Sequence, residues 1–200
     1  GAVAPAQAYQ NLQARDNRRE TWQFSGIAIS GVSGDFTVTY DFNGGNQRMV
    51  AQSGGNTVLE AYRIGGQLFT RNPLGGGYIA TDASNPLSQP VQQLFELPRT
   101  ILTNLIPPDA KYTAAGIETV NGRAATRYTG NVNFANLGVL NPSLQGQSGT
   151  SVTTIWVANE GGYIVATEAN VQASAGGTAN ATRARLDVTE VGTVPAISVP

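Results

Sequence analysis

The chain has 200 residues, of which 40% are hydrophobic and only 12% charged, with a formal net charge of −1 and neither Cys nor His. This length suits one domain with a substantial core, so we expect residues 1–200 to form a single domain. The near-neutral charge excludes an electrostatic nucleic-acid interface, and the lack of Cys and His excludes disulfides, thiolate sites and the commonest metal ligand, so we expect no nucleic-acid partner, no metal and no cofactor.

Residues 4–17 open the chain with a helical pattern, because the segment APAQAYQNLQARDN contains no β-branched residue. Three basic side chains, Arg15, Arg18 and Arg19, follow one another at its end and just beyond. We interpret them as a solvated helix end, with contact to anionic lipid headgroups as the alternative.

The chain up to residue 82 alternates between strand-forming runs and turns rich in Gly and Asn, which accept the positive φ of tight hairpins. The clearest run is DFTVTYDF, in which Phe36, Val38, Tyr40 and Phe42 share one face of a strand. We predict strands at 20–30, 34–43, 47–53, 57–64, 67–72 and 77–82.

Residues 86–106 change to a helical period, and Pro107-Pro108 ends the segment. Because a proline lacks the backbone N–H of the helical ladder, Pro98 is expected to kink this helix or divide it in two. One apolar stripe follows from the spacing of Val91, Leu94, Phe95, Ile101, Leu102 and Leu105.

The second half returns to strands, which we predict at 111–120, 123–133, 150–158, 163–173 and 178–191. Asn121-Gly122 is the strongest hairpin signal in the chain, Gly176-Gly177 marks another turn, and 134–147 is expected to form a short helix or loop. The hairpin around Gly161-Gly162 is apolar on both faces, so each face needs a cover.

About eleven strands with short connections predict an antiparallel sheet too large to stay flat. The concave face of such a sheet needs a cover, and the 86–106 helix carries the apolar stripe for that role. The sequence therefore predicts an α+β fold, a strongly curled antiparallel sheet or half-open β-barrel covered by helices. One face of the 151–172 hairpin then packs on the helices, and the other meets a loop, a partner or a ligand.

No set of side chains in the sequence forms a catalytic constellation. The carboxylates on predicted strands are interpreted as single, solvated groups on the outer face: Asp35, Asp41, Glu60, Glu118, Glu168 and Glu190. We therefore predict that the protein is not an enzyme and has no catalytic residues, with a carboxylate-based hydrolase as a minor alternative. Aromatic side chains are spread over many strands, where they fit a core or the lining of an apolar ligand site.

The order of five motifs resembles that of the LppX/LprG type of bacterial envelope lipoproteins, which are relatives of the lipoprotein carrier LolA. The motifs are YRIGGQLFTRNPLGGGYIATD (62–82), VQQLFELPRTILTNLIPP (91–108), AGIETVNGRAATRYTGNVN (115–133), TTIWVANEGGYIVATEANV (153–171) and TRARLDVTEVGTVPAISVP (182–200). The resemblance implies a half-barrel around helices, with a hydrophobic cavity for a lipid or acyl chain.

The resemblance also implies an extracytoplasmic protein of the cell envelope, attached to the membrane surface through an N-terminal anchor that we expect to have been removed, with a member that is not lipidated as the alternative. We expect a monomer that binds lipid, with an envelope sensor or protein-binding module on the same fold as the alternative. The residues predicted to line the lipid cavity, with a role in the plain core as the alternative for each, are Phe36, Val38, Tyr40, Phe42, Tyr62, Phe69, Leu94, Phe95, Ile101, Leu102, Leu105, Trp156 and Tyr163.

Overall fold

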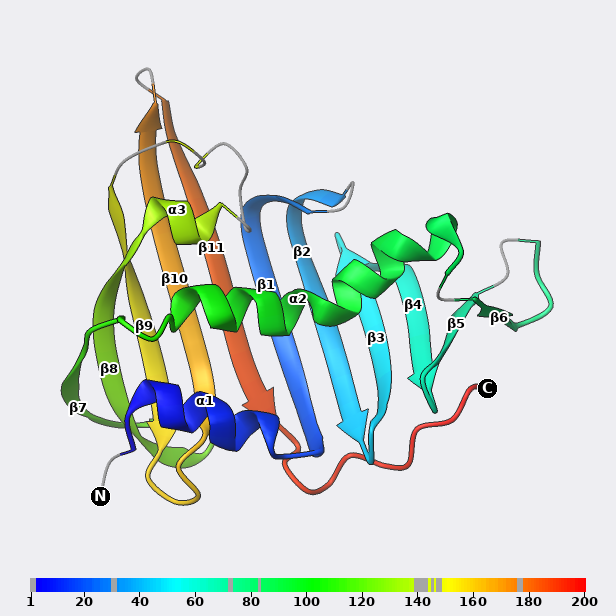
Figure 1. The fold of residues 1–200 in the computed structure, drawn as a ribbon, viewed down its shortest axis with the longest axis horizontal. Helices are drawn as coiled ribbons and strands as arrows, with labels where there is room; N and C mark the ends of the chain where they lie inside the picture. The colour runs from blue at the N-terminus through cyan, green and yellow to red at the C-terminus, as the bar shows by residue number, and fades with distance from the viewer. Residues whose placement is uncertain are drawn as a thin grey trace.

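The computed structural model describes residues 3–29, 32–71, 74–82, 84–138, 144, 146, 149–175 and 178–200 (Figure 1). The strands of these residues form one antiparallel sheet of 11 strands, in the order β6-β5-β4-β3-β2-β1-β11-β10-β9-β8-β7. The sheet is not closed, because β6 and β7 lie at opposite edges. The predicted α+β class is confirmed.

Strands that follow one another in sequence pair with one another, except for β6 and β7, and at the centre of the sheet β1 also pairs with β11. The first half of the chain thus builds one side of the sheet and the second half builds the other. The elements of the first half are α1 (Pro5–Gln13), β1 (Asn17–Ile29), β2 (Val32–Asn43), β3 (Asn46–Ser53), β4 (Asn56–Ile64), β5 (Gln67–Arg71) and β6 (Tyr78–Thr81). Those of the second half are η1 (Pro86–Ser88), α2 (Gln89–Leu105), β7 (Tyr112–Val120), β8 (Arg123–Asn133), α3 (Phe134–Leu137), β9 (Thr150–Ala158), β10 (Ile164–Ala175) and β11 (Thr178–Thr189).

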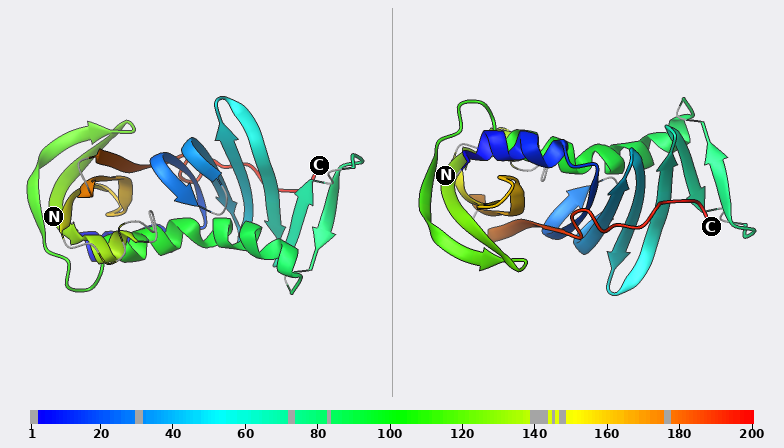
Figure 2. Two further views of the ribbon diagram at one scale, coloured as in Figure 1. Left: turned by 90° about the horizontal axis from the view of Figure 1, so that it is seen from above. Right: turned by 90° about the horizontal axis from the view of Figure 1, so that it is seen from below.

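Helix α2 connects the two edges of the sheet, since it lies between β6 and β7 in the chain. Its 17 residues span about 26 Å, whereas 11 strands lying flat would extend over about 48 Å. The edges can be joined by one such helix because the sheet curls, and Figure 2 shows α2 running across its concave side. We call the face under α1 and α2 the inner face and the opposite one the outer face.

The structure refines the predictions for three segments. Helix α1 ends at Gln13, and β1 already begins at Asn17, so Arg18 and Arg19 lie on a strand and not at a solvated helix end. Pro98 lies inside α2 without dividing it. Of the segment 134–147, residues 134–137 form α3, whereas 139–143, 145 and 147 lie outside the described residues, as does the Gly176-Gly177 turn.

The turn between β7 and β8 has the predicted hairpin geometry. Asn121 and Gly122 both have positive φ, 52° and 74°, and the two strands pair directly up to Val120 and Arg123. Asn and Gly tolerate this left-handed conformation better than other residues, so the local sequence fixes the turn.

The chain after β11 runs past the ends of β1, β2 and β3 (Figure 1). Two asparagines at those ends hold it, because the Nδ2 atoms of Asn17 and Asn43 donate to the carbonyl of Val194 at 3.0 and 2.8 Å. Residues 194–198 then line an outer-face pocket of ≈ 260 Å³ with Arg19 and Tyr62.

Candidate functional site

The apolar side of α2 packs on the inner face of the sheet. Its buried side chains belong to one hydrophobic cluster with the aromatic and aliphatic residues of β1 and β2. The alternation predicted for β2 is present, since Phe36, Val38 and Tyr40 are all buried in this cluster and Phe42 packs against it. From α2 the cluster takes Leu94, Phe95, Leu97, Ile101, Leu102 and Leu105. The layer between helix and sheet is therefore apolar along most of α2.

Pro98 creates the main polar link between α2 and the sheet. Because Pro98 has no N–H, the carbonyl of Leu94, four residues earlier, loses its helical donor. The hydroxyl of Tyr40 on β2 donates to that carbonyl at 2.6 Å. Burial, and then the negative charge of Glu20, raises the pKa of Tyr40 well above its usual value, so the phenol stays protonated as a donor.

Two further tyrosines tie α2 to the rest of the fold. At the end of the helix the hydroxyl of Tyr112, which begins β7, donates to the carbonyl of Leu105 at 2.5 Å, and burial raises the pKa of this phenol. The hydroxyls of Tyr9 on α1 and Thr103 on α2 lie 3.2 Å apart. These few polar contacts fix the helix in place, and apolar packing supplies the rest of its attachment.

Three of the predicted cavity residues lie on the outer face, away from α2. Tyr62 pairs with Arg48 of β3 and with Phe69 of β5 in register, and its hydroxyl contacts the Arg48 guanidinium at 3.2 Å. Trp156 alternates with the buried Ile155 and so points to the opposite side of β9. These positions correct the prediction for Tyr62, Phe69 and Trp156, because the pleat of their strands turns them from the concave side.

Tyr163 occupies a separate place below α1, in the turn between β9 and β10. The guanidinium groups of Arg15 and Arg123 lie 4.2 and 5.7 Å from the centroid of its ring. The Nδ2 atom of Asn11 on α1 donates to the carbonyl of Gly162 in the same turn at 2.7 Å. Helix α1 thus covers the end of this hairpin, and Tyr163 does not contact α2 by any hydrogen bond within the described residues.

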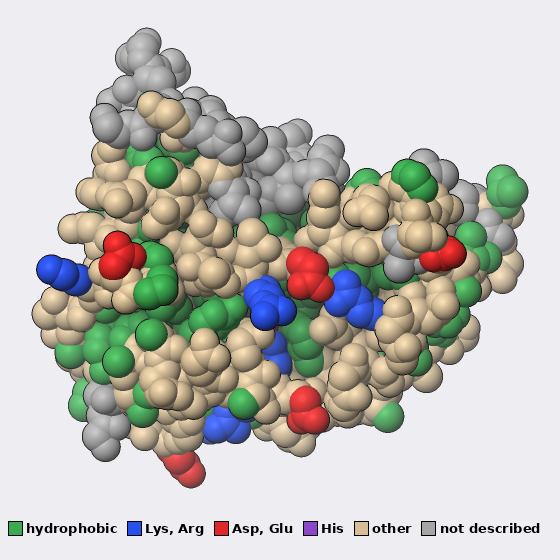
Figure 3. Space-filling view, viewed as in Figure 1, with side chains coloured by type: hydrophobic (Ala, Val, Ile, Leu, Met, Phe, Trp, Pro, Cys, Tyr) green, Lys and Arg blue, Asp and Glu red, His purple; other side chains and the backbone are tan. Residues whose placement is uncertain are grey.

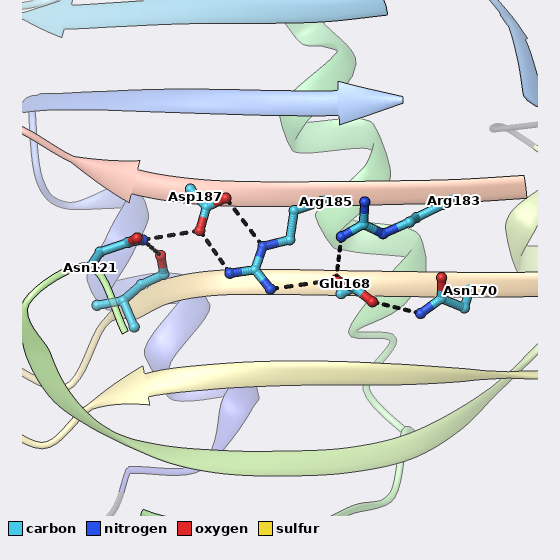
Figure 4. Close-up of polar contacts among 7 residues, drawn as sticks. Asn121, Glu168, Asn170, Arg183, Arg185 and Asp187 are labelled. Carbon is cyan, nitrogen blue, oxygen red and sulfur yellow. Dashed lines mark hydrogen bonds and ion pairs between the residues drawn. The ribbon is translucent and has the colours of Figure 1, made fainter. Parts of the chain in front are cut away.

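The half of the β9–β10 hairpin near its turn is covered on its second face by the same chain. The guanidinium of Arg185 lies 4.7 Å from the ring centroid of Trp156. The turn between β7 and β8 folds back over this face, where Asn121 Nδ2 donates to Val165 O at 3.0 Å and to Asp187 Oδ1 at 3.1 Å (Figure 4). A loop of the protein itself is therefore the cover that the apolar pattern required.

Carboxylates on the outer face are held by arginines. Glu168 on β10 accepts from Arg183 at 2.8 Å and from Asn170 at 2.7 Å, and Arg185 forms a further ion pair with Asp187 (Figure 4). Partial burial acts to raise the pKa of Glu168, but these donors outweigh it and lower the pKa overall. The prediction of a single, solvated Glu168 was wrong.

A second network occupies the outer face of β1 to β4. Arg19 binds both carboxylate oxygens of Asp41, at 2.6 and 3.1 Å, and Glu60 accepts from Arg48 at 2.7 Å and from Tyr62 at 2.9 Å. Asp41 and Glu60 were also predicted to be single and solvated, and both are instead ion-paired and largely buried. Among the described residues no group of three metal-ligating side chains comes together.

The inner face also carries polar groups, at a pocket of ≈ 240 Å³ between α2 and the lower ends of β1 to β4. Figure 3 views this side of the molecule and shows several charged side chains near its middle. The deepest are Arg18 and Glu20, whose Nε and Oε1 atoms lie 2.8 Å apart with side-chain exposures of 6% and 0%. Trp22 Nε1 donates to the other Glu20 oxygen at 3.3 Å.

Sequence reasoning missed this pocket because it assigned Arg18 to a helix end. The available signal was the period of two in Arg18, Glu20, Trp22 and Phe24, which places all four side chains on one face of a strand. In the structure the carbonyl of Arg15 and the ring of Phe42, 4.0 Å from the guanidinium carbon, complete the surroundings of Arg18.

Comparison with known families matches residues 6–196 to the family described as LppX_LprAFG lipoprotein. Among solved structures, the Mycobacterium tuberculosis lipoprotein LppX is similar with a TM-score of 0.59 and 14% identity, covering 96% of this chain and 95% of its own. LprF from Mycobacterium bovis is similar with a TM-score of 0.51 and 14% identity, covering 100% of this chain and 98% of its own. No curated protein matches the chain.

Proposed function

Because the chain belongs to the LppX_LprAFG lipoprotein family, we propose that it is a non-enzymatic protein of the bacterial cell envelope that binds a lipid acyl chain between α2 and the inner face of the sheet. The observation that carries this proposal is the continuous apolar layer between the α2 stripe and the aromatic residues of β2. A hydrocarbon chain matches the chemistry of that layer and gains about 0.8 kcal/mol per buried methylene.

The attachment of α2 supports an exchangeable layer. Within the described residues the helix is linked to the remainder of the fold by a few hydrogen bonds and one ion pair, Arg63–Glu96 at 3.0 Å. Apolar contacts are non-directional, so a hydrocarbon guest can replace one set of them with another as α2 moves outward. A polar or hydrogen-bonded interface would not permit that exchange at similar free energy.

An extracytoplasmic location follows from membership of a lipoprotein family, and we propose that the protein works at the membrane surface of the envelope. No helix of the described residues has the length and hydrophobicity needed to cross a bilayer. The proposal includes residues 1–200 as a single domain that acts as a monomer.

The two tryptophans provide a test of where the lipid binds, since Trp22 lies on the inner face and Trp156 on the outer face. In a Trp156→Phe variant, a brominated fatty acid or phospholipid is expected to quench the fluorescence of Trp22, because bromine acts at contact range. In the matched Trp22→Phe variant the same ligand should leave Trp156 bright. Native mass spectrometry before and after organic extraction then gives the stoichiometry.

Quenching of Trp156 but not of Trp22 would place the lipid on the outer face and contradict the proposed site. Absence of both quenching and extractable lipid would reject lipid binding altogether.

A second function is favoured by the β7 edge. Within the described residues β7 pairs with β8 alone, and Ile117 on it is 71% exposed. An unpaired edge with an exposed apolar residue can accept a strand from another protein. Capture of a partner from envelope extract that persists in detergent, and is lost on Ile117→Lys, would favour a protein-binding module.

A further inference from the structure

We propose that the pocket between α2 and β1 to β4 holds the anionic headgroup of an amphiphile, with phosphoglycerol as its chemical type. The inference rests on the proposed function, because the acyl chain of that amphiphile would occupy the apolar layer under α2. The pocket volume of ≈ 240 Å³ is below the ~300–1,000 Å³ of sites that enclose a whole small molecule, so it fits a headgroup and not an entire lipid.

The side chains that line the pocket carry a net positive charge. Three arginines line it, Arg18, Arg63 and Arg99, against two glutamates, Glu20 and Glu96. Arg18 pairs with Glu20 and Arg63 with Glu96, whereas Arg99 forms no ion pair within the described part of the chain. A phosphate placed here would meet a guanidinium that has no carboxylate partner, together with the outer N–H groups of Arg63.

The buried Arg18–Glu20 pair supports a role in binding. Moving two charges out of water costs free energy that their attraction only about balances, so apolar residues would serve the fold as well. At this position the pair instead makes the floor of the pocket polar, next to the otherwise apolar inner face.

The same pocket has an apolar side that is continuous with the layer under α2. Phe42, Phe95 and Pro98 line it, and Phe95 belongs to the core cluster. The guanidinium carbon of Arg63 lies 4.8 Å from the centroid of Phe95, so charge and hydrocarbon surface meet here. That junction is what an amphiphile requires, since its phosphate and its first methylenes must leave water together.

The side chain of Gln47 indicates that the ligand carries a hydroxyl group. Its Oε1 atom is buried at the pocket and has no hydrogen-bond partner. A buried acceptor without a donor is unfavourable, and a glycerol hydroxyl next to a phosphate would supply that donor. Choline, which carries neither a net negative charge nor a donor, would not.

Titration calorimetry with short-chain lipids below their micelle concentration tests the site. Dihexanoyl phosphatidylglycerol is expected to bind about tenfold or more tightly than dihexanoyl phosphatidylcholine, a preference that weakens with salt. The Arg63→Gln/Arg99→Gln double variant should lose that preference, so that phosphatidylglycerol binds it no more tightly than phosphatidylcholine does. Arg71→Gln, which removes the same charge from an exposed position on β5, is the matched control and should change nothing.

Equal binding of the two lipids by the unmodified protein, or a preference that survives in the double variant, would overturn the headgroup site and leave acyl-chain binding intact. Inorganic phosphate binding as tightly as phosphatidylglycerol would show a free-anion site instead and also overturn it. If neither lipid binds to any variant, the proposed function fails and the headgroup site fails with it. Thermal melts of each variant establish that the comparison is between folded proteins.

Discussion

Tyr40→Phe isolates the contact that compensates for Pro98. The substitution removes the hydroxyl that donates to Leu94 O at 2.6 Å and leaves that carbonyl buried without a donor. An unsatisfied buried polar group costs about 1–3 kcal/mol. For a chain of 200 residues, a loss of about 2 kcal/mol lowers Tm by roughly 4–8 °C. We expect a change of that size by thermal melt and by urea titration.

A variant of Pro98 tests whether the proline is the reason for this cost. Pro98→Ala restores an N–H that can donate to Leu94 O within the helix, so Tyr40→Phe should cost much less free energy in the Pro98→Ala background. Tyr163→Phe is the control for loss of a phenol, because the Tyr163 hydroxyl is buried without a hydrogen-bond partner. We expect it to change stability by less than about 0.5 kcal/mol.

The same cost of Tyr40→Phe in both backgrounds would refute this account of Pro98. So would a loss for Tyr163→Phe as large as that for Tyr40→Phe. In either case the tyrosine on β2 would stabilise α2 by packing alone.

Other variants test the remaining features. Leu102→Ala should lower the free energy of unfolding by about 2–5 kcal/mol in urea titrations, because this fully buried side chain lies between α2 and the sheet; a loss below 1 kcal/mol would contradict a packed layer. Asn121→Val should destabilise more than Asn121→Gly, since only Val adds the strain of a φ of 52° to the lost side-chain hydrogen bonds; the reverse order in thermal melts would refute the hairpin geometry. The pKa values of Glu60 and Glu168 lie below their ordinary value of 4.5 in the folded protein, so the stability they contribute is present above pH 4.5 and is lost as pH falls through the lowered values. Urea midpoints measured from about pH 6 down to pH 3 should therefore fall, and they should fall less in the Glu168→Gln variant. An equal fall in that variant would rule out a contribution from Glu168.

Local patterns in the sequence were sufficient for the elements of the fold. Alternation in DFTVTYDF fixed which side chains of β2 share a face, and the period of 3.6 in 86–106 fixed which side of α2 is apolar. Asn121-Gly122 fixed its turn through backbone sterics alone. The order of motifs supplied the family, and the match over residues 6–196 confirms it.

Alternation says which residues share a face, but it does not say which of the two faces becomes the inside. That choice depends on the order and curl of strands distant in sequence, and it placed Tyr62 and Trp156 on the outer face. The same long-range order brings Arg18 and Glu20 of β1 beside Arg63 of β4 and the middle of α2. From sequence alone, a charged side chain is predicted to be solvated, because burial of an unpaired charge is costly. Only the tertiary structure brings together the partners that make its burial energetically acceptable.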